Sequence, residues 1–467
     1  MDRLRHNRGN PGRVPTPSRE GLRPAKPGLV HANARGNGRA PTHARDPFRR
    51  DDSDGARPKP EPRQRRAFST LGGPVDVGGE PDGARLLRKL LDVDPAAARA
   101  LTHGFHSYAG RMHPSIARGA IDALSKPGET VIDPFCGSGT VLVEAMAAGR
   151  AAIGVDASAL AVAIARVRST LLGEDDRERL VAEAARIAEE SSERARKRRR
   201  PEVPPWAGQE ITRFHAHVLF ELLGLRELVF ATKEDQVGWA LRLCLSSILV
   251  KFMKAGPEAP RDGEAKRIAR GIPSRMLADR AVELGRGLGA LERRMPAGTP
   301  APVVHEADAR ALPIPDGRAA LVLSSPPYAG TYDYAAQHET RFVWLGLSAR
   351  KFRKVQMGAR VSAIGDTRAD VWRADETRFV AEIARVLRPG GHALLVVGDG
   401  VVDGQPEHAP DSVAEAGAPV GLEPIARASQ ARPIHDRRLA AIFGDRPRRE
   451  HLLLLRKRGA TEVRRRG

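Results

Sequence analysis

The loop Ser325-Pro326-Pro327-Tyr328 contains the residue types that most directly suggest chemistry. It follows the apolar run 321–323, so we expect it to leave the C-terminal end of a buried strand. Two consecutive prolines fix φ and remove two backbone donors, while their carbonyls remain as acceptors in a stiff frame. With a hydroxyl before them and an aromatic ring after them, the loop suits an exocyclic amino group on a planar base. Oxygens would accept the protons of the amine, and the ring would stack on the base.

A second segment, from Val131 to Thr140, predicts a strand that ends at Asp133, then a glycine turn, then a helix over 141–146. The next strand ends at Asp156. Strand, glycine turn, helix, strand and acid form the nucleoside-cofactor half of a doubly wound sheet. The glycines let the backbone approach the ligand closely, and we expect Asp156 to accept hydrogen bonds from the ribose hydroxyls.

Dinucleotide binding is the usual alternative for a glycine turn of this kind. Leu142 stands where the third glycine of that fingerprint belongs, and Asp133 would repel a pyrophosphate. S-adenosylmethionine has no phosphate and carries an ammonium and a sulfonium group, so an acid in this position attracts it. The residues therefore favour S-adenosylmethionine as the cofactor.

Together, Asp133–Thr140 and Ser325–Tyr328 resemble the cofactor and catalytic motifs of the S-adenosylmethionine-dependent DNA amino methyltransferases, the N4-cytosine and N6-adenine methylases. In that family Ser before Pro-Pro-Tyr is more typical of N4-cytosine enzymes, and Asp or Asn of N6-adenine enzymes. The segment His106–Pro114 resembles the one that closes over the methionine end of the cofactor. The resemblance covers roughly Thr102–Thr170 and Val303–Arg456.

The resemblance implies a role for each motif. The expected catalytic residues are Ser325, Pro326, Pro327 and Tyr328. The expected cofactor-binding residues are Asp133, Pro134, Phe135, Gly137, Ser138, Gly139, Thr140, Asp156, Asp308 and Ala309, the last two at the strand end where the family binds the adenine amine. Candidates for substrate or lid contacts are Tyr108, Arg111, His113, Tyr332, Tyr334 and Asp399. No metal is expected, and a lid or surface role is expected for His103 and His106 as well as for His113.

The expected activity is methyl transfer to an exocyclic amine in DNA, with cytosine N4 preferred and adenine N6 as the alternative. Guanine N2 in tRNA stays open, and so does a degenerate methylase fold that only binds nucleic acid. C5-cytosine chemistry is disfavoured because it needs a nucleophilic Cys, typically in a Pro-Cys pair, and the sequence has none. Cys136 is expected to be a small packed residue.

Composition agrees with a nucleic-acid partner. The 467 residues have a formal net charge of +20, which fits either an Arg-rich proteome or a polyanionic ligand, and the two motifs favour the ligand. Two cysteines without zinc-ligand spacing indicate a reducing, cytoplasmic compartment. No apolar run is long enough to span a bilayer, and the Arg- and Pro-rich N-terminus lacks the apolar core of a secretory signal. A restriction-modification context is a further expectation.

We expect an α/β, doubly wound, Rossmann-like class I methyltransferase sheet with a helical insertion. The expected organisation is a disordered basic tail at 1–80, a cofactor half at 81–173, the insertion at 174–300, and a catalytic half at 301–460. Asp133, Asp156, Asp308, Ser325 and Asp399 all fall at expected strand ends, where open α/β sheets bind ligands. Helical patterns in the insertion cover 177–200, 213–230, 237–254 and 274–294, and we expect this region to recognise the substrate or to act as a lid.

Overall fold

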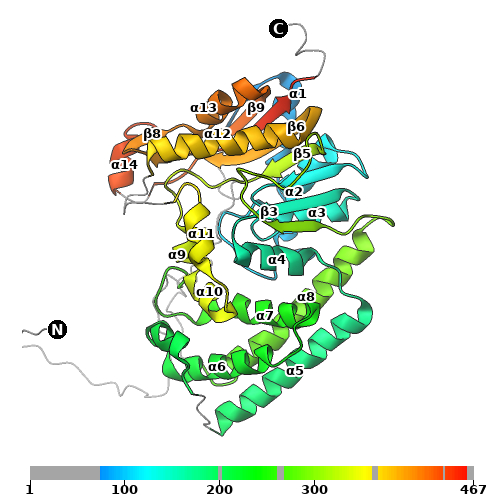
Figure 1. Ribbon diagram of the computed structural model, residues 1–467, viewed down its shortest axis with the longest axis vertical. Coiled ribbons are helices and arrows are strands. Elements are labelled where there is room, and N and C mark those ends of the chain that lie inside the picture. Colours follow the sequence, from blue (N-terminus) through cyan, green and yellow to red (C-terminus); the bar gives the residue numbers. More distant parts are fainter. Residues whose placement is uncertain (1–73, 198–201, 260–267, 360–366, 435–436, 460–467) are drawn as a thin grey trace, which may run out of the picture. The chain divides into compact units, whose positions relative to one another are not determined.

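The computed structural model describes residues 74–197, 202–259, 268–359, 367–434 and 437–459. Within these ranges one eight-stranded sheet organises the chain, in the spatial order β1-β9-β10-β6-β5-β2-β3-β4 (Figure 1). The strands are β1 Val75–Gly79, β2 Thr130–Asp133, β3 Ala151–Asp156, β4 Val303–Glu306, β5 Ala319–Ser324, β6 Leu387–Gly398, β9 Leu422–Ala431 and β10 Arg449–Lys457. A small hairpin joins β7 Gly400–Val402 to β8 Gln405–Glu407.

The five strands from β4 to β6 run parallel, and β10 enters antiparallel between β6 and β9. Numbered along the chain from β2, these seven strands have the order 3-2-1-4-5-7-6. The strand order therefore changes direction between the neighbouring strands β2 and β5. This is the switch point, where a doubly wound sheet opens a crevice. The fold is that of a class I methyltransferase, as the motifs predicted.

Period-two alternation of apolar side chains lets helices cover both faces of the sheet. Val131 faces one core cluster and Ile132 the other, and Leu452 and Leu453 divide in the same way. One face packs against α1 Pro81–Leu90, α2 Pro114–Leu124 and α3 Thr140–Ala147. The other packs against α12 Ala369–Val386 and α13 Ala409–Gly417.

A helical region follows α4 Ala159–Ser169 and forms a third core cluster of its own. Its helices are α5 Glu174–Arg196, α6 Ala216–Phe230, α7 Gln236–Phe252 and α8 Ile272–Arg294, which lie at the lower end of Figure 1. They begin and end close to the four helical patterns expected for the insertion. Short helices α9 Tyr334–Gln337, α10 Glu339–Leu345 and α11 Ala349–Val355 follow the catalytic loop and join this cluster. The remaining elements are α14 Arg437–Phe443 and three short 3-10 helices, Pro95–Arg99, Pro205–Thr212 and Ala418–Val420.

One expectation about the elements needs correction. The tail expected to be disordered to residue 80 contains β1, because Val75–Gly79 pairs antiparallel with β9; residues 1–73 lie outside the described residues. The strand β9 has no counterpart in the sequence prediction. The helix α12 ends at Val386, and β6 begins at the next residue, Leu387.

Candidate active site

A cavity of about 850 Å³, open solvent included, lies at the carboxyl ends of β2, β3 and β5. The glycine turn and the Ser-Pro-Pro loop both line it, although their sequence separation is nearly 200 residues. Residues from the sequence prediction that line the cavity are Tyr108, Arg111, Asp133, Pro134, Phe135, Gly137, Ser138, Thr140, Asp156, Asp308, Ala309, Ser325, Pro327 and Tyr334.

The glycine turn has a backbone that only glycine adopts easily. Gly137 and Gly139 have φ of +47° and +79°, and a Cβ on Gly139 would lie 3.0 Å from the Cα of Ala165. The Gly137 N–H donates to Asp156 Oδ2 over 2.9 Å, and the Ser158 N–H donates to Oδ1 over 2.8 Å. The acid at the end of β3 therefore fixes the turn at the end of β2 and borders the cavity at the same time.

Asp133 joins the two halves of the site directly. The Ser324 hydroxyl, on the last residue of β5, donates to Asp133 Oδ1 over 2.6 Å, and the Phe135 N–H donates to the same oxygen over 3.1 Å. Ser324 is fully buried, whereas Ser325, the next residue, lines the cavity. This pair places the loop from β5 against the loop from β2 across one crevice.

Burial raises the pKa values of both carboxyls that border the cavity. The pKa of Asp133 rises to about 7 because burial outweighs the hydrogen bonds from Ser324 and Phe135. The pKa of Asp156 rises to about 6 because burial outweighs its two backbone donors. Two closely spaced, desolvated carboxyls in a cavity favour a cationic ligand, because a positive charge restores the ionised forms.

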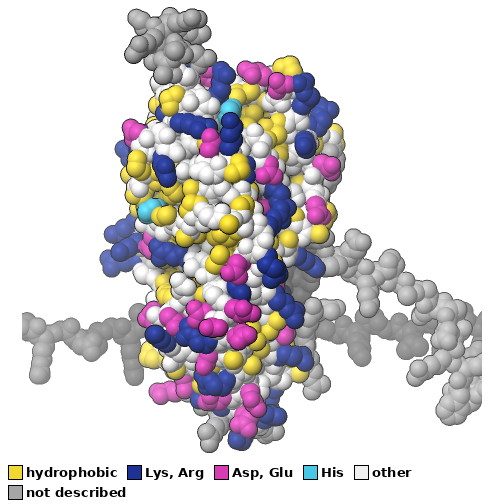
Figure 2. Space-filling view, turned by 90° about the vertical axis from the view of Figure 1, so that its right-hand side faces the viewer, with side chains coloured by type: hydrophobic (Ala, Val, Ile, Leu, Met, Phe, Trp, Pro, Cys, Tyr) yellow, Lys and Arg dark blue, Asp and Glu magenta, His cyan; other side chains and the backbone are white. Residues whose placement is uncertain are grey.

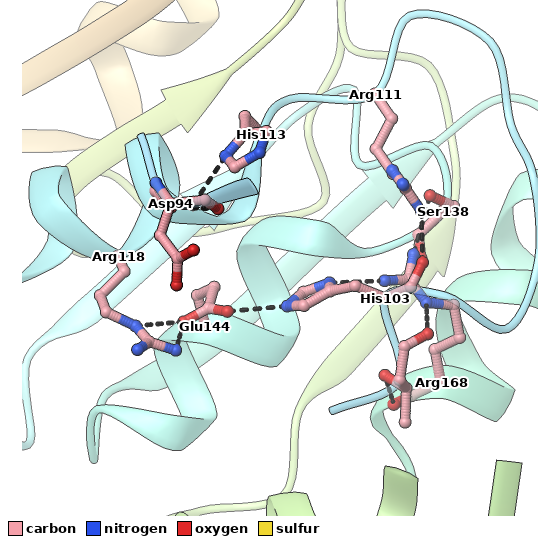
Figure 3. A network of polar contacts seen from close by, with 10 residues as sticks. Asp94, His103, Arg111, His113, Arg118, Ser138, Glu144 and Arg168 are labelled. Carbon is pink, nitrogen blue, oxygen red and sulfur yellow. Dashed lines mark hydrogen bonds and ion pairs between the residues drawn. The ribbon is translucent and has the colours of Figure 1, made fainter. Parts of the chain in front are cut away.

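A buried polar network holds the glycine turn from behind (Figure 3). Arg168 of α4 is fully buried; its Nη1 donates to Ser138 Oγ over 2.8 Å and also to the Ser138 carbonyl, while Nε donates to the Thr102 carbonyl over 3.0 Å. Its Nη2 donates to His103 Nδ1 over 2.8 Å. His103 is thereby fixed as the tautomer with a proton on Nε2, which donates to Glu144 Oε1 over 2.7 Å.

The network ends at the surface, where Arg118 donates two hydrogen bonds of 2.9 and 2.8 Å to Glu144 Oε2. Burial lowers the pKa of His103 to about 4, so the imidazole is neutral at pH 7. The surface or lid role expected for His103 and His106 is wrong, because both side chains are buried inside the protein. Sequence reasoning also missed Arg168 and Glu144, which carry no local motif.

The Ser325–Tyr328 loop borders two neighbouring cavities. Ser325 and Pro327 line the large one, whereas Pro326, Pro327 and Tyr328 line a second, smaller cavity of about 310 Å³, open solvent included. The Tyr328 ring packs on Gly398, where a Cβ would lie 2.5 Å from the ring, and its hydroxyl donates to Glu450 Oε1 over 2.7 Å. The ring therefore has a fixed position at the side of the loop away from the cofactor turn.

The segment His106–Pro114 borders the large cavity through residues 108–112. Tyr108 stacks on His338 with ring centroids 4.7 Å apart, and Tyr334 lies parallel to it at 6.4 Å. His113 does not line the cavity; its Nδ1 accepts from the Ser115 N–H over 3.2 Å and caps α2. Tyr332 is exposed by 36% and lies beside Tyr334 outside the cavity.

The two remaining aspartates have internal partners. Asp308 lines the cavity, and although burial acts to raise its pKa, hydrogen bonds from Arg310 outweigh burial and lower it. Asp399 lies outside the cavity and accepts from the Arg449 N–H and from His451 Nε2, both over 2.9 Å. Asp399, His408 and His451 lie close together and are residue types that can bind a metal. Both ring nitrogens of His451, however, are engaged in hydrogen bonds with Asp399 and Ser429.

Cys136 lines the cavity as a buried thiol, and burial raises its pKa well above the ordinary value. It is therefore no thiolate nucleophile, as expected. Residues 352 and 355–357 also line the cavity. The sequence did not predict this, because nothing in these residues indicates that their segment packs beside the cavity. No helix in the described ranges is long and apolar enough to cross a membrane.

The charges of the insertion are largely paired. Figure 2 shows acidic and basic side chains interspersed over the lower part of the face that carries α5 and α8. Within α5, Arg186 pairs with Glu183 over 2.9 Å, and Arg194 pairs with Glu190 over 2.6 Å. Spacings of three and four residues are typical of a solvated helix face. The basic run at the end of α5 continues into residues 198–200, which lie outside the described residues.

Comparison with known proteins finds sequence similarity in the segment that contains the glycine turn. Residues 102–166 match the DNA methylase family with N6- and N4-type members. A segment of 66 residues is 39% identical to the Type II methyltransferase M.MjaII of Methanocaldococcus jannaschii; it spans 14% of this chain and 12% of that relative. The matched chain segment thus covers about an eighth of the relative's length.

Solved structures that match this chain share little sequence with it. A geranyl diphosphate C-methyltransferase from Streptomyces coelicolor A3(2) is 11% identical with a TM-score of 0.30, over 78% of this chain and 88% of that one. The [4+2]-cyclase SpnF is 12% identical with a TM-score of 0.30, over 84% and 97%. The similarity to DNA methylases rests on the sequence match to residues 102–166, which contain the glycine turn and the acid of β3.

Proposed function

We propose that this protein transfers the methyl group of S-adenosylmethionine to an exocyclic amino group of a base in DNA, with cytosine N4 as the preferred acceptor. The observation that carries the proposal is the shared cavity of the glycine turn and the Ser-Pro-Pro loop, joined by the hydrogen bond between Ser324 and Asp133. The family match supports the cofactor and the substrate class.

Each part of the cofactor would have a partner among the residues of the cavity. Asp156 would accept hydrogen bonds from the ribose hydroxyls, as acids at the end of the second strand do in such sheets. Asp308 and Ala309 border the cavity at the next strand end, where they would meet the adenine. Asp133 and the backbone of residues 134–138 would surround the methionine part, and the cationic cofactor would restore the negative charge that burial suppresses.

The reaction is an in-line displacement in which the base nitrogen attacks the methyl carbon and the sulfur–carbon bond breaks. The sulfur retains the electron pair, and S-adenosylhomocysteine leaves as the neutral thioether. The Ser325 hydroxyl oxygen and the Pro326 carbonyl oxygen would accept hydrogen bonds from the two N–H groups of the amine. These hydrogen bonds would direct the nitrogen lone pair toward the methyl. The methylated nitrogen then loses one proton to water. Positioning and electrostatics carry such a step without a covalent intermediate.

The exocyclic amine of a base stacked within a duplex could not reach the Ser325 hydroxyl, which lines the cavity. The target base must therefore leave the helical stack or belong to a single strand. The Tyr328 ring, fixed by Gly398 and Glu450, would stack against it. The helical region from α5 to α8 would recognise the DNA or cover the site.

Nucleoside mass spectrometry tests the proposal. We expect N4-methylcytosine in DNA from cells that express the protein, and none with the Ser325→Ala variant, which should still bind S-adenosylmethionine in calorimetry. tRNA from the same cells should show no change in N2-methylguanine. Unmodified DNA together with modified tRNA would replace DNA by RNA as the substrate. If neither nucleic acid gains a methyl group, the proposed activity is wrong.

A further inference from the structure

The second cavity, on the other side of Pro327 from the cofactor cavity, has a lining that differs from the first. One face of α12 supplies Trp372, Glu376 and Phe379, spaced four and three residues apart, so these side chains lie on one stripe of the helix. Tyr328 of the catalytic loop lies opposite. Trp372 is close to that loop, since a Cβ on Gly358 would lie 2.9 Å from the Trp372 ring and 3.3 Å from the Tyr328 carbonyl.

Trp372 has an unused hydrogen-bond donor in this cavity lining. Its side chain is only 5% exposed, and its Nε1–H has no hydrogen-bond partner among the described residues. Buried indole N–H groups nearly always have a partner, because an unpaired donor in an apolar environment is unfavourable. A cavity bordered by such a donor is suited to a ligand with an acceptor atom.

Glu376 provides a second donor. It is 4% exposed and accepts a hydrogen bond from the Ser412 hydroxyl over 3.1 Å, which occupies one carboxyl oxygen. Burial raises the pKa of Glu376 to about 8, so the carboxyl is protonated at neutral pH and its O–H is available to donate. The two donors lie one helical turn apart on the same side of α12.

We infer that the second cavity is the base subsite and that Trp372 and Glu376 select cytosine. This inference rests on the proposed function and deepens it. Next to the amino group, the hydrogen-bonding edge of cytosine carries two consecutive acceptors, N3 and O2. Adenine has one acceptor, N1, followed by a C–H group. Two donors in a row match cytosine, whereas adenine would leave one buried donor unpaired, which disfavours it by about tenfold or more.

The aromatic residues complete the subsite. Tyr328 and Phe379 both line the second cavity, and the Tyr328 ring would provide the stacking surface. Phe379 also makes an edge-on contact with Phe135 of the cofactor cavity, with ring centroids 5.3 Å apart. Cofactor and base therefore meet at Pro327, which borders both cavities, beside the Ser325 hydroxyl.

Matched variants test the donors one at a time. Trp372→Phe retains the ring and removes the N–H; Trp206→Phe makes the same change in the insertion, away from both cavities, and serves as the control. Glu376→Leu removes the donor, whereas Glu376→Gln retains one in its amide. Methyl incorporation into methylation-free genomic DNA is followed by nucleoside mass spectrometry, and S-adenosylmethionine affinity by calorimetry.

We expect N4-methylcytosine as the product of the parent protein, with kcat/KM lowered about tenfold or more by Trp372→Phe and by Glu376→Leu. Glu376→Gln and Trp206→Phe should stay within about threefold, and cofactor affinity should be unchanged in all four. N6-methyladenine as the product would overturn the base assignment but leave the methyltransferase proposal intact. Full activity of Trp372→Phe or of Glu376→Leu would also overturn it. No methylated base at all would refute the proposed function itself.

The pH profile adds a readout that a merely structural role would not change. Activity of the parent protein should fall as pH rises above about 8, when Glu376 ionises and cannot donate. The Glu376→Gln variant should lack that fall. The charged or hydroxyl groups that face Glu376 from its own helix, from β8 and from α13 are Arg373, Glu407, Ser412 and Glu415. Identical alkaline limbs in both proteins would show that one of these other groups titrates instead, and would overturn the donor role.

Discussion

The affinity for S-adenosylmethionine should depend on pH through Asp133, because burial raises its pKa to about 7 in the empty site. If only the ionised carboxyl attracts the cationic cofactor, affinity follows the ionised fraction. That fraction falls from about 0.9 at pH 8 to about 0.1 at pH 6, a loss of about tenfold. Asp156, with a pKa of about 6, adds about a factor of two over the same range.

A surface ion pair would show no such dependence between pH 6 and pH 8, because its acid is ionised throughout this range. The pKa of Asp133 in the folded, empty protein lies above its unfolded value, so the empty protein retains a proton up to about pH 7 and releases it when the cofactor binds. Calorimetry in buffers of different ionisation enthalpy measures that release. The Asp133→Asn variant is the matched control: it cannot ionise, so only the twofold contribution of Asp156 should remain.

Titration of the cofactor's own amino group occurs with both proteins and cancels from the ratio of their affinities. We therefore expect this ratio, parent over Asp133→Asn, to increase about tenfold between pH 6 and pH 8. A constant ratio, or a parent protein that releases no proton at pH 6.5, would refute the assignment of Asp133 as the acid that meets the cationic end of the cofactor.

Three further predictions concern the supports of the site. Gly398→Ala should displace the Tyr328 ring and lower turnover at least tenfold with unchanged cofactor affinity. The control is Gly224→Ala, because the space around Gly224 is open. A fully active Gly398→Ala variant would contradict the packing argument. Arg168→Met should leave hydrogen-bond acceptors of Ser138 and His103 unpaired. The free energy of unfolding should therefore fall by about 2–4 kcal/mol, and cofactor binding should weaken. An unchanged melting temperature would show that the network is dispensable. Deletion of residues 1–73, which have 17 basic and 7 acidic residues, should weaken DNA binding and flatten its salt dependence; an identical salt slope would exclude the tail as a DNA contact.

The sequence predicted the cofactor half of the sheet almost completely, because its signals are local. The strand that ends at Asp133, the glycine turn and the strand that ends at Asp156 each occupy fewer than a dozen residues, and backbone geometry requires glycine at 137 and 139. The site at the switch point follows from topology alone, since carboxyl ends of neighbouring parallel strands meet at one edge.

What the sequence did not indicate depends on contacts between distant segments. The strand β1 exists because β9 offers a partner edge, and neither has the apolar content of a central strand. Arg168 reads as an ordinary helix residue until its guanidinium is seen between Thr102, His103 and Ser138. Likewise, the position of Tyr328 depends on the absence of a side chain at Gly398, seventy residues later.

The two adjacent serines at the end of β5 explain how one strand serves both halves of the site. Ser324, the last residue of β5, donates to Asp133, whereas Ser325, the first residue of the following loop, lines the cavity. Asp133 is the carboxyl whose charge depends on the cofactor, and Ser325 is the proposed acceptor for the amine. Because a single peptide unit joins Ser324 and Ser325, a change in the charge of Asp133 acts one residue away from the proposed catalytic hydroxyl. Cofactor binding would therefore be coupled to the alignment of the base.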